Sequence, residues 1–112
     1  MAALCSTSME VVPHIVIGLH YGKILGEPIA LDICGRHGIH ALVLVIVMPF
    51  YAKPGTFITP STKGVGEVFL EARCRLGEKQ VLLGCARPPG MVRRVIDTYA
   101  VLAGLDGIAF PA

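Results

Sequence analysis

Short runs of apolar and β-branched residues recur along the chain at 11–17, 41–48, 81–85 and 107–110. Each run contains too few polar residues to leave one face of a strand in water, which predicts strands that are buried on both faces. Helical periodicity separates the runs, and this alternation predicts parallel strands joined by right-handed crossovers. The expected fold class is α/β, with the order βαβαβαβ over residues 11–112 after a lead-in segment at 1–10.

Three helices are expected between these strands, and the second has the clearest signals. Ser61 or Thr62 can cap its start, Gly77 can end it, and Glu71 can pair with Arg75 on its outer face. Apolar residues recur at three- and four-residue steps along it, as expected for one buried helix face. These residues are Val65, Val68, Phe69, Ala72 and Leu76.

The first and third helices are expected on either side of it in the chain. In the first, Pro28 fits the first helical position, Ile29 and Ile33 share a face, and Gly35 or Gly38 can end the helix. In the third, Gly104 supplies the stop. Its expected inward stripe is Val92, Val95, Ile96, Tyr99, Leu102 and Ala103, and its expected outward residues are Arg93, Arg94 and Asp97.

The fourth run is followed directly by Pro111 and Ala112, so the last expected strand lacks a covering helix. Four parallel strands with apolar faces form a small open sheet, or they complete a barrel with another four-stranded unit. We therefore expect half of a (β/α) barrel, whose surplus apolar surface needs a partner.

Composition narrows the classes of function. Of the 112 residues, 54% are hydrophobic and 16% charged, which favours a folded domain over a disordered linker. The net charge of +2, with no basic cluster beyond Arg93-Arg94, argues against a nucleic-acid or anionic-lipid surface. The apolar stretch 41–52 is too short for a membrane helix, and residues 1–9 lack the features of a signal peptide.

The cysteines and histidines predict no metal site from this chain alone. Cys5, Cys34, Cys74 and Cys85 are widely and irregularly spaced, which fits neither a disulfide scaffold nor a paired-cysteine zinc site. No second histidine or carboxylate stands at ligand spacing. Four reduced thiols and a cytoplasmic location are expected.

In parallel α/β folds, functional groups gather in the loops that follow the carboxyl ends of the strands. The loop after the first strand contains Gly18, which can let a ligand approach the backbone, and His20 and Tyr21, which offer hydrogen bonds. A simple glycine turn is an equally good interpretation. The loop lacks the glycine spacing and the hydroxyl residue of a phosphate-binding loop, which argues against nucleotide hydrolysis.

Cys85 and Arg87 follow the third strand. Arg87 precedes two prolines and Gly90 at the start of a helix, an arrangement that suits a bound carboxylate or phosphate; the alternative is an ion pair with a nearby acid. Cys85 has no accompanying Cys/His motif, so a small buried hydrophobe is a better interpretation than a nucleophile. His14 lies within a strand, where a position in the core or in a barrel lumen is expected.

Three longer segments resemble radical S-adenosylmethionine enzymes related to biotin synthase and lipoyl synthase. They are residues 12–23 (VPHIVIGLHYGK), 83–88 (LGCARP) and 103–111 (AGLDGIAFP). The resemblance runs from about residue 11 to the C-terminus. The spacing of the four strands is similar to that in the second half of the family's (β/α) barrel.

The resemblance implies a [4Fe-4S] cluster, held by three cysteines of a CxxxCxxC loop in the first half-barrel, that cleaves S-adenosylmethionine to a 5′-deoxyadenosyl radical. It implies that the strand carrying Ile17 and Gly18 packs against the adenosyl group, and that Met48 and Pro49 offer backbone to the adenine. It also implies that Cys85 and Arg87 line the substrate or carboxylate side of the same cavity.

The chain departs from this family by lacking CxxxCxxC, and its four cysteines cannot supply three closely placed cluster ligands. His14 and Tyr21 also stand where family members often have a glycine and a glutamate. We expect a C-terminal half-barrel that is inactive alone. Its expected partner is a chain carrying the missing half, or a second copy joined through the sheet edges. The alternative is a small non-catalytic α/β module that binds an anionic metabolite through Arg87 and the loop glycines.

Overall fold

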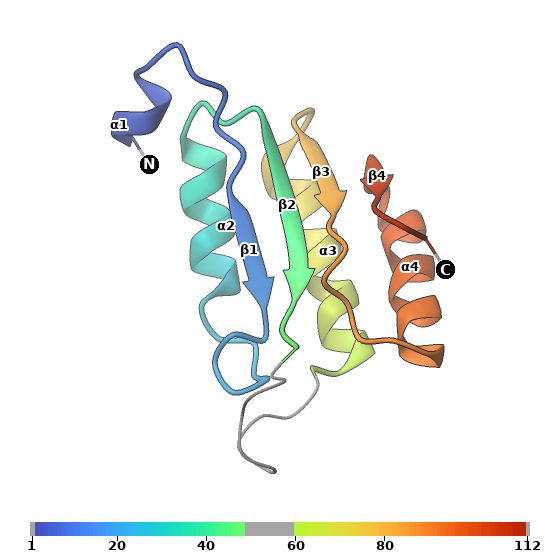
Figure 1. Cartoon of the computed structure of the whole chain (residues 1–112). Helices are drawn as coiled ribbons and strands as arrows, with labels where there is room; N and C mark the ends of the chain where they lie inside the picture. Colours follow the sequence, from blue (N-terminus) through green and yellow to red (C-terminus); the bar gives the residue numbers. More distant parts are fainter. Residues whose placement is uncertain (1, 49–59, 112) are drawn as a thin grey trace.

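The computed structural model describes residues 2–48 and 60–111, which form a four-stranded parallel sheet with helices between the strands (Figure 1). This arrangement confirms the α/β class and the parallel βαβαβαβ order. The strands are β1 (His14–Ile17), β2 (Ala41–Ile46), β3 (Gln80–Leu83) and β4 (Gly107–Ile108). The helices are α1 (Ala2–Cys5), α2 (Glu27–Arg36), α3 (Thr62–Leu76) and α4 (Met91–Ala103).

The strands lie in the sheet in the order of the sequence, β1-β2-β3-β4. Every crossover therefore steps in the same direction, and right-handed crossovers in one direction place their helices on one face of the sheet. Figure 1 shows α2, α3 and α4 together behind the sheet. The paired residues Ile15, Leu44, Leu83 and Ile108 mark one row across the four strands.

The hydrophobic core lies between the sheet and these three helices. Alternate strand residues point into it, and each helix contributes one apolar face. From the strands these residues include Ile15, Ile17, Leu42, Leu44, Ile46, Val81 and Leu83, and from the helices Leu31, Val65, Phe69 and Ile96.

The opposite side of the sheet, which we call the open face, is apolar but only half-buried. Val16, Val43, Val45 and Leu82 alternate along the strands with the core residues and point to this side. Among residues 2–48 and 60–111, no helix covers it. The expectation that the strands are buried on both faces is therefore wrong for the described residues, because all three crossover helices occupy the other side.

Helix α3 follows its predicted pattern throughout. The Ser61 hydroxyl accepts a hydrogen bond from the Gly64 N–H at 3.0 Å, and Gly77 ends the helix at a φ of 57°. The predicted apolar residues are all buried, and Glu71 pairs with Arg75 at 2.9 Å. None of the helices in the described ranges combines the length and apolar character that a membrane crossing requires.

The faces predicted for the other two helices need correction. In α2, Ile29 and Ile33 share a face, but they are 66% and 38% exposed, and Leu31 and Cys34 fill the core instead. In α4, Leu102 is exposed, whereas Asp97, expected on the outside, is buried with Ile96, Ala100 and Ala103. The stripe is displaced because Arg87 lies beneath this helix and pairs with Asp97.

Gly84 lies where an added side chain would strike the open face. A Cβ at this position would lie 2.5 Å from Val45 Cγ1 and 3.0 Å from Val43 Cγ1. We expect Gly84→Ala to lower the free energy of unfolding by about 1–3 kcal/mol, because overpacking forces neighbouring side chains to shift. Urea-induced unfolding measures the change. The control is Gly38→Ala, which meets nothing within 4 Å; equal stability of the two variants would contradict this packing.

Asp106 connects the amino ends of β3 and β4. Its carboxylate accepts hydrogen bonds from the Val81 N–H and from Arg73 Nη1, both at 2.8 Å, and these bonds lower its pKa below the ordinary value of 3.8. A carboxyl group with a lowered pKa stabilises the fold above the unfolded-state pKa, and this contribution disappears as the pH falls through the folded-state pKa.

Asp106→Asn is therefore expected to reduce stability at neutral pH and to flatten the acid limb of the stability profile below about pH 4. Free energies of unfolding measured between acidic and neutral pH test this expectation. The exposed residue Glu78 offers the control variant Glu78→Gln. An unchanged acid limb in Asp106→Asn would be inconsistent with the hydrogen bonds described.

Candidate functional site

The carboxyl ends of the four strands lie at the same end of the sheet because the strands are parallel. The loops that begin there contain Gly18 to Lys23 after β1, Cys85 to Arg87 after β3, and Phe110 after β4. Met48, which follows β2, is half-buried, while Pro49 lies outside the described residues. This end of the sheet is where a ligand-binding site is expected in a parallel α/β fold.

The loop after β1 is a tight turn that needs unusual backbone angles. Gly18, Tyr21 and Gly22 have φ values of 83°, 55° and 88°, and the Gly22 N–H donates to the Gly18 carbonyl at 2.7 Å. A Cβ at Gly18 would lie 2.3 Å from Pro60 Cγ. Glycine is therefore required at position 18 both for the backbone angle and for the close approach of Pro60.

Glu27, the first residue of α2, is a buried carboxylate that the sequence reasoning missed. It is 5% exposed, and its Oε2 accepts a hydrogen bond from the Gly18 N–H at 3.3 Å. A carboxylate in the first helical turn is also favoured by the helix dipole. The sequence signal that could have identified Glu27 was its position directly before Pro28, at the start of a helix that follows a glycine-rich loop. Glu27 thus fixes the start of α2 to the end of β1.

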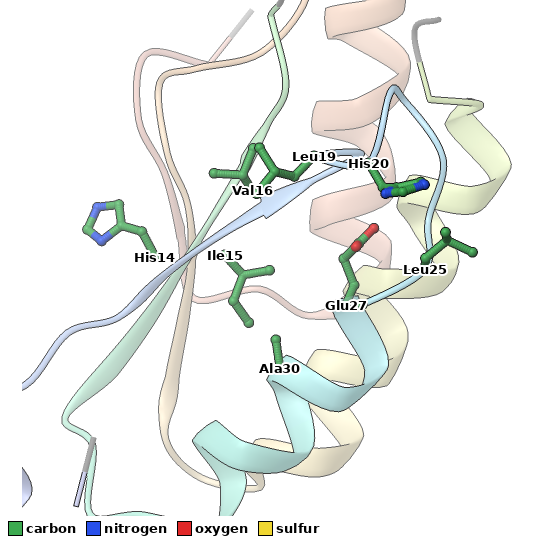
Figure 2. Close-up of a pocket in the computed structure, with 9 residues that line it drawn as sticks. His14, Ile15, Val16, Leu19, His20, Leu25, Glu27 and Ala30 are labelled. Atoms are coloured by element: carbon green, nitrogen blue, oxygen red, sulfur yellow. The ribbon is translucent and has the colours of Figure 1, made fainter. Parts of the chain in front are cut away.

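A groove of about 470 Å³ runs beside β1 on the side away from β2, and we call it the β1-edge groove. Figure 2 shows the Glu27 carboxylate and the His20 ring on one side of β1, whereas His14 points away on the other side. The His20 ring packs edge-on against Tyr21, with centroids 5.2 Å apart. The groove is lined by His14, Ile15, Val16, Leu19, His20, Leu25, Gly26, Glu27 and Ala30.

The guanidinium of Arg87 is engaged within the protein. Its Nε lies 2.8 Å from Asp97 Oδ1, and the side chain of Arg87 is fully buried. The two terminal nitrogens donate to the carbonyls of Gly84, Ala109 and Phe110 at 2.6, 2.8 and 2.9 Å. Of the two interpretations of Arg87, the ion pair with a nearby acid is the one observed, and the fully buried guanidinium is closed to an external anion.

Three further residues predicted from the sequence, Ile17, Cys85 and His14, differ in their exposure to solvent. Ile17 is fully buried on the helix side, and its carbonyl accepts from the Val47 N–H at 3.0 Å, so its side chain does not reach the open face. Cys85 is exposed, which contradicts the interpretation as a buried hydrophobe. His14 is exposed at the margin of the open face. Among all the predicted site residues, Gly18, His20 and Tyr21 lie together in the loop after β1, whereas Arg87 lies beneath α4.

The residues of this chain do not fit a [4Fe-4S] cluster. No group of three or more His, Cys, Asp or Glu side chains in the described ranges could hold a metal ion. Cys34 is buried, and burial raises the pKa of its thiol, whereas Cys74 and Cys85 are exposed. A cluster needs three closely placed thiolates. The site geometry provides backbone groups, one buried carboxylate and an apolar surface for binding.

No known protein family matches this sequence, and neither the curated proteins nor the solved structures include a significantly similar chain.

Arg87→Met is expected to lower the free energy of unfolding by about 3–5 kcal/mol, because it leaves Asp97 as a buried charge without its partner. The control is Arg75→Met, which removes the solvent-exposed ion pairs of Arg75 with Glu71 of α3 and Asp32 of α2 and is expected to cost about 1 kcal/mol. Urea unfolding of both variants makes the comparison. Equal losses would show that the Arg87–Asp97 pair is not a structural contact of the core.

Proposed function

We propose that this chain is one half of a (β/α) barrel and that it supplies one wall of a ligand cavity when a second four-stranded unit covers its open face. The observation that supports this most strongly is the combination of sequential strand order with an apolar open face. In doubly wound folds the strand order reverses, and helices then cover both faces. In a barrel, the uncovered face becomes the interior, where bulky branched residues pack in layers.

The chemistry that we propose for the completed barrel is that of the radical S-adenosylmethionine enzymes related to biotin synthase. The cluster would belong to the other half, because this chain has no ligands for it. In this proposal the strand end at Gly18 lies against the adenosyl group and the backbone at Met48 faces the adenine. Glu27 supports the proposal, since its hydrogen bond to the Gly18 N–H holds that strand end in a fixed conformation.

The alternative, a module that binds an anionic metabolite through Arg87, receives no support from the geometry. Asp97 neutralises the guanidinium, and its terminal nitrogens donate to three carbonyls and, at 3.4 Å, to Asp97 Oδ2. Binding an anion there would require breaking a buried ion pair, which is costly.

The proposal predicts S-adenosylmethionine cleavage that depends on both halves. The chain is mixed, without oxygen, with the cluster-bearing N-terminal half of a biotin synthase or a lipoyl synthase, and the release of 5′-deoxyadenosine is measured. We expect release from the mixture and none from this chain alone.

Gly18→Val in this chain is expected to abolish the release, because the new side chain would collide with Pro60 and strain the backbone at the strand end. Gly38→Ala is expected to retain it. A rate of 5′-deoxyadenosine release that is the same with and without this chain, for both cluster-bearing halves, would refute the proposed function.

A further inference from the structure

The outer edge of β1 presents free backbone hydrogen-bonding groups. The carbonyls of Pro13 and Ile17 accept from the N–H groups of Val43 and Val47, so alternate residues of β1 face β2. In a parallel ladder the intervening residues, His14 and Val16, then direct their N–H and C=O groups to the opposite edge. Within the described ranges no strand pairs with this edge, and none pairs with the outer edge of β4.

Exposed apolar side chains lie beside the free edge of β1, and a groove of mixed polar and apolar lining lies beside the free edge of β4. Beside β1, the outward face of α2 and the loop before it expose Leu25 and Ile29, which are 59% and 66% exposed. Beside β4, a second groove of about 470 Å³ runs along the outer flank of α4, and we call it the β4-edge groove. It is lined by Arg94, Asp97, Thr98, Val101, Ile108 and Pro111.

Each groove contains one acidic residue, but the two acids are engaged differently. Asp97, in the β4-edge groove, is paired with the buried Arg87, so Arg94 in the first turn of α4 is the exposed charge of that groove. Glu27, the acid of the β1-edge groove, is the first residue of α2 and is 5% exposed. Both helices begin at the carboxyl ends of the strands. Arg94 is exposed, and its guanidinium makes no ion pair with any residue in the described part of the chain.

We propose that the two free edges close on a second copy of this chain, with β1 of each copy pairing in parallel with β4 of the other, to form an eight-stranded barrel with two-fold symmetry. A two-fold axis makes the two junctions identical, so one complementary pair of edges is sufficient for closure. Each junction brings Arg94 of one copy toward the β1-edge groove of its partner, which contains Glu27. Eight strands give a barrel whose interior side chains can just fill.

This closure resolves three exposed features together. It pairs the outward backbone groups of His14 and Val16, which otherwise invite uncontrolled association. It encloses Val43, Val45 and Leu82 of both copies in one interior, where branched apolar side chains are expected. It also covers the apolar surface beside the two edges. The inference rests on the proposed function only in taking the open face as a barrel interior. The dimer is a barrel without a cluster, and a cluster-bearing half would replace one of its two copies.

Sedimentation velocity and amide hydrogen exchange on the full chain test the proposal. We expect a dimer at micromolar concentration, in which the His14 and Val16 amides exchange slowly and become faster on dilution to the monomer. The Ile17 amide, which faces β2, is the internal reference and should stay protected in both forms. Slow exchange at His14 and Val16 distinguishes edge pairing from two sheets stacked by their open faces.

Two variants make the test specific. Arg94→Glu is expected to weaken the dimer by about ten-fold or more, because it places a like charge against the groove that contains Glu27. Lys63→Glu makes the same charge change at the exposed start of α3, away from both edges, and should leave the dimer unchanged. Val16→Pro removes the outward N–H and should give a monomer whose circular dichroism is that of the folded chain.

A monomer at micromolar concentration, or a dimer with fast exchange at His14 and Val16, would overturn this inference. Equal effects of Arg94→Glu and Lys63→Glu would overturn the proposed junction. None of these results would decide the release of 5′-deoxyadenosine with a cluster-bearing half, so the failure of the dimer and the failure of the proposed function are distinguishable.

Discussion

Right-handed crossovers between strands that are neighbours in both sequence and space place α2, α3 and α4 on a single face of the sheet. This constraint divides the strand residues into two sets. One set, including Ile17 and Leu44, is buried against the helices, and the other, including Val43 and Val45, forms the half-buried open face. Within residues 2–48 and 60–111, the outer edges of β1 and β4 have no strand partner. The apolar face and these two edges are the features on which we base the proposal of an incomplete barrel.

The parts of the fold that depend on local sequence signals were predictable. Helix α3 has a capping serine, a regular apolar period and a terminal glycine, and each signal acts within one or two turns. The parallel order also followed from the alternation of strand and helix. The sequence did not predict which faces of the sheet are covered. A run such as 41–48 is equally apolar whether helices or a barrel interior cover its second face, or whether that face is uncovered.

The errors in the predicted faces and in the site arise from long-range pairing. Asp97 has the periodic position of an outward residue, but Arg87, ten residues earlier, turns it inward by forming a buried ion pair. The same pairing removes Arg87, the predicted anion ligand, from the surface at the carboxyl ends of the strands. Glu27 is buried because its carboxylate bonds to the Gly18 N–H across the loop. The periodicity of the sequence does not indicate that Arg87 pairs with Asp97 or that Glu27 bonds to Gly18. The need for glycine at position 18, in contrast, could be inferred from the loop sequence.

In the proposed assembly, a second four-stranded unit covers the open face. The most direct measurement is the relaxation of side-chain methyl groups by a soluble paramagnetic agent, observed by nuclear magnetic resonance on the assembled protein. We expect weak enhancement for the methyls of Val43, Val45 and Leu82, which the second unit would cover. Leu102 is 76% exposed and lies on the side of α4 that faces α3, so its methyls give the accessible reference. Enhancement of the open-face methyls equal to that of Leu102 would show that no second unit covers the open face.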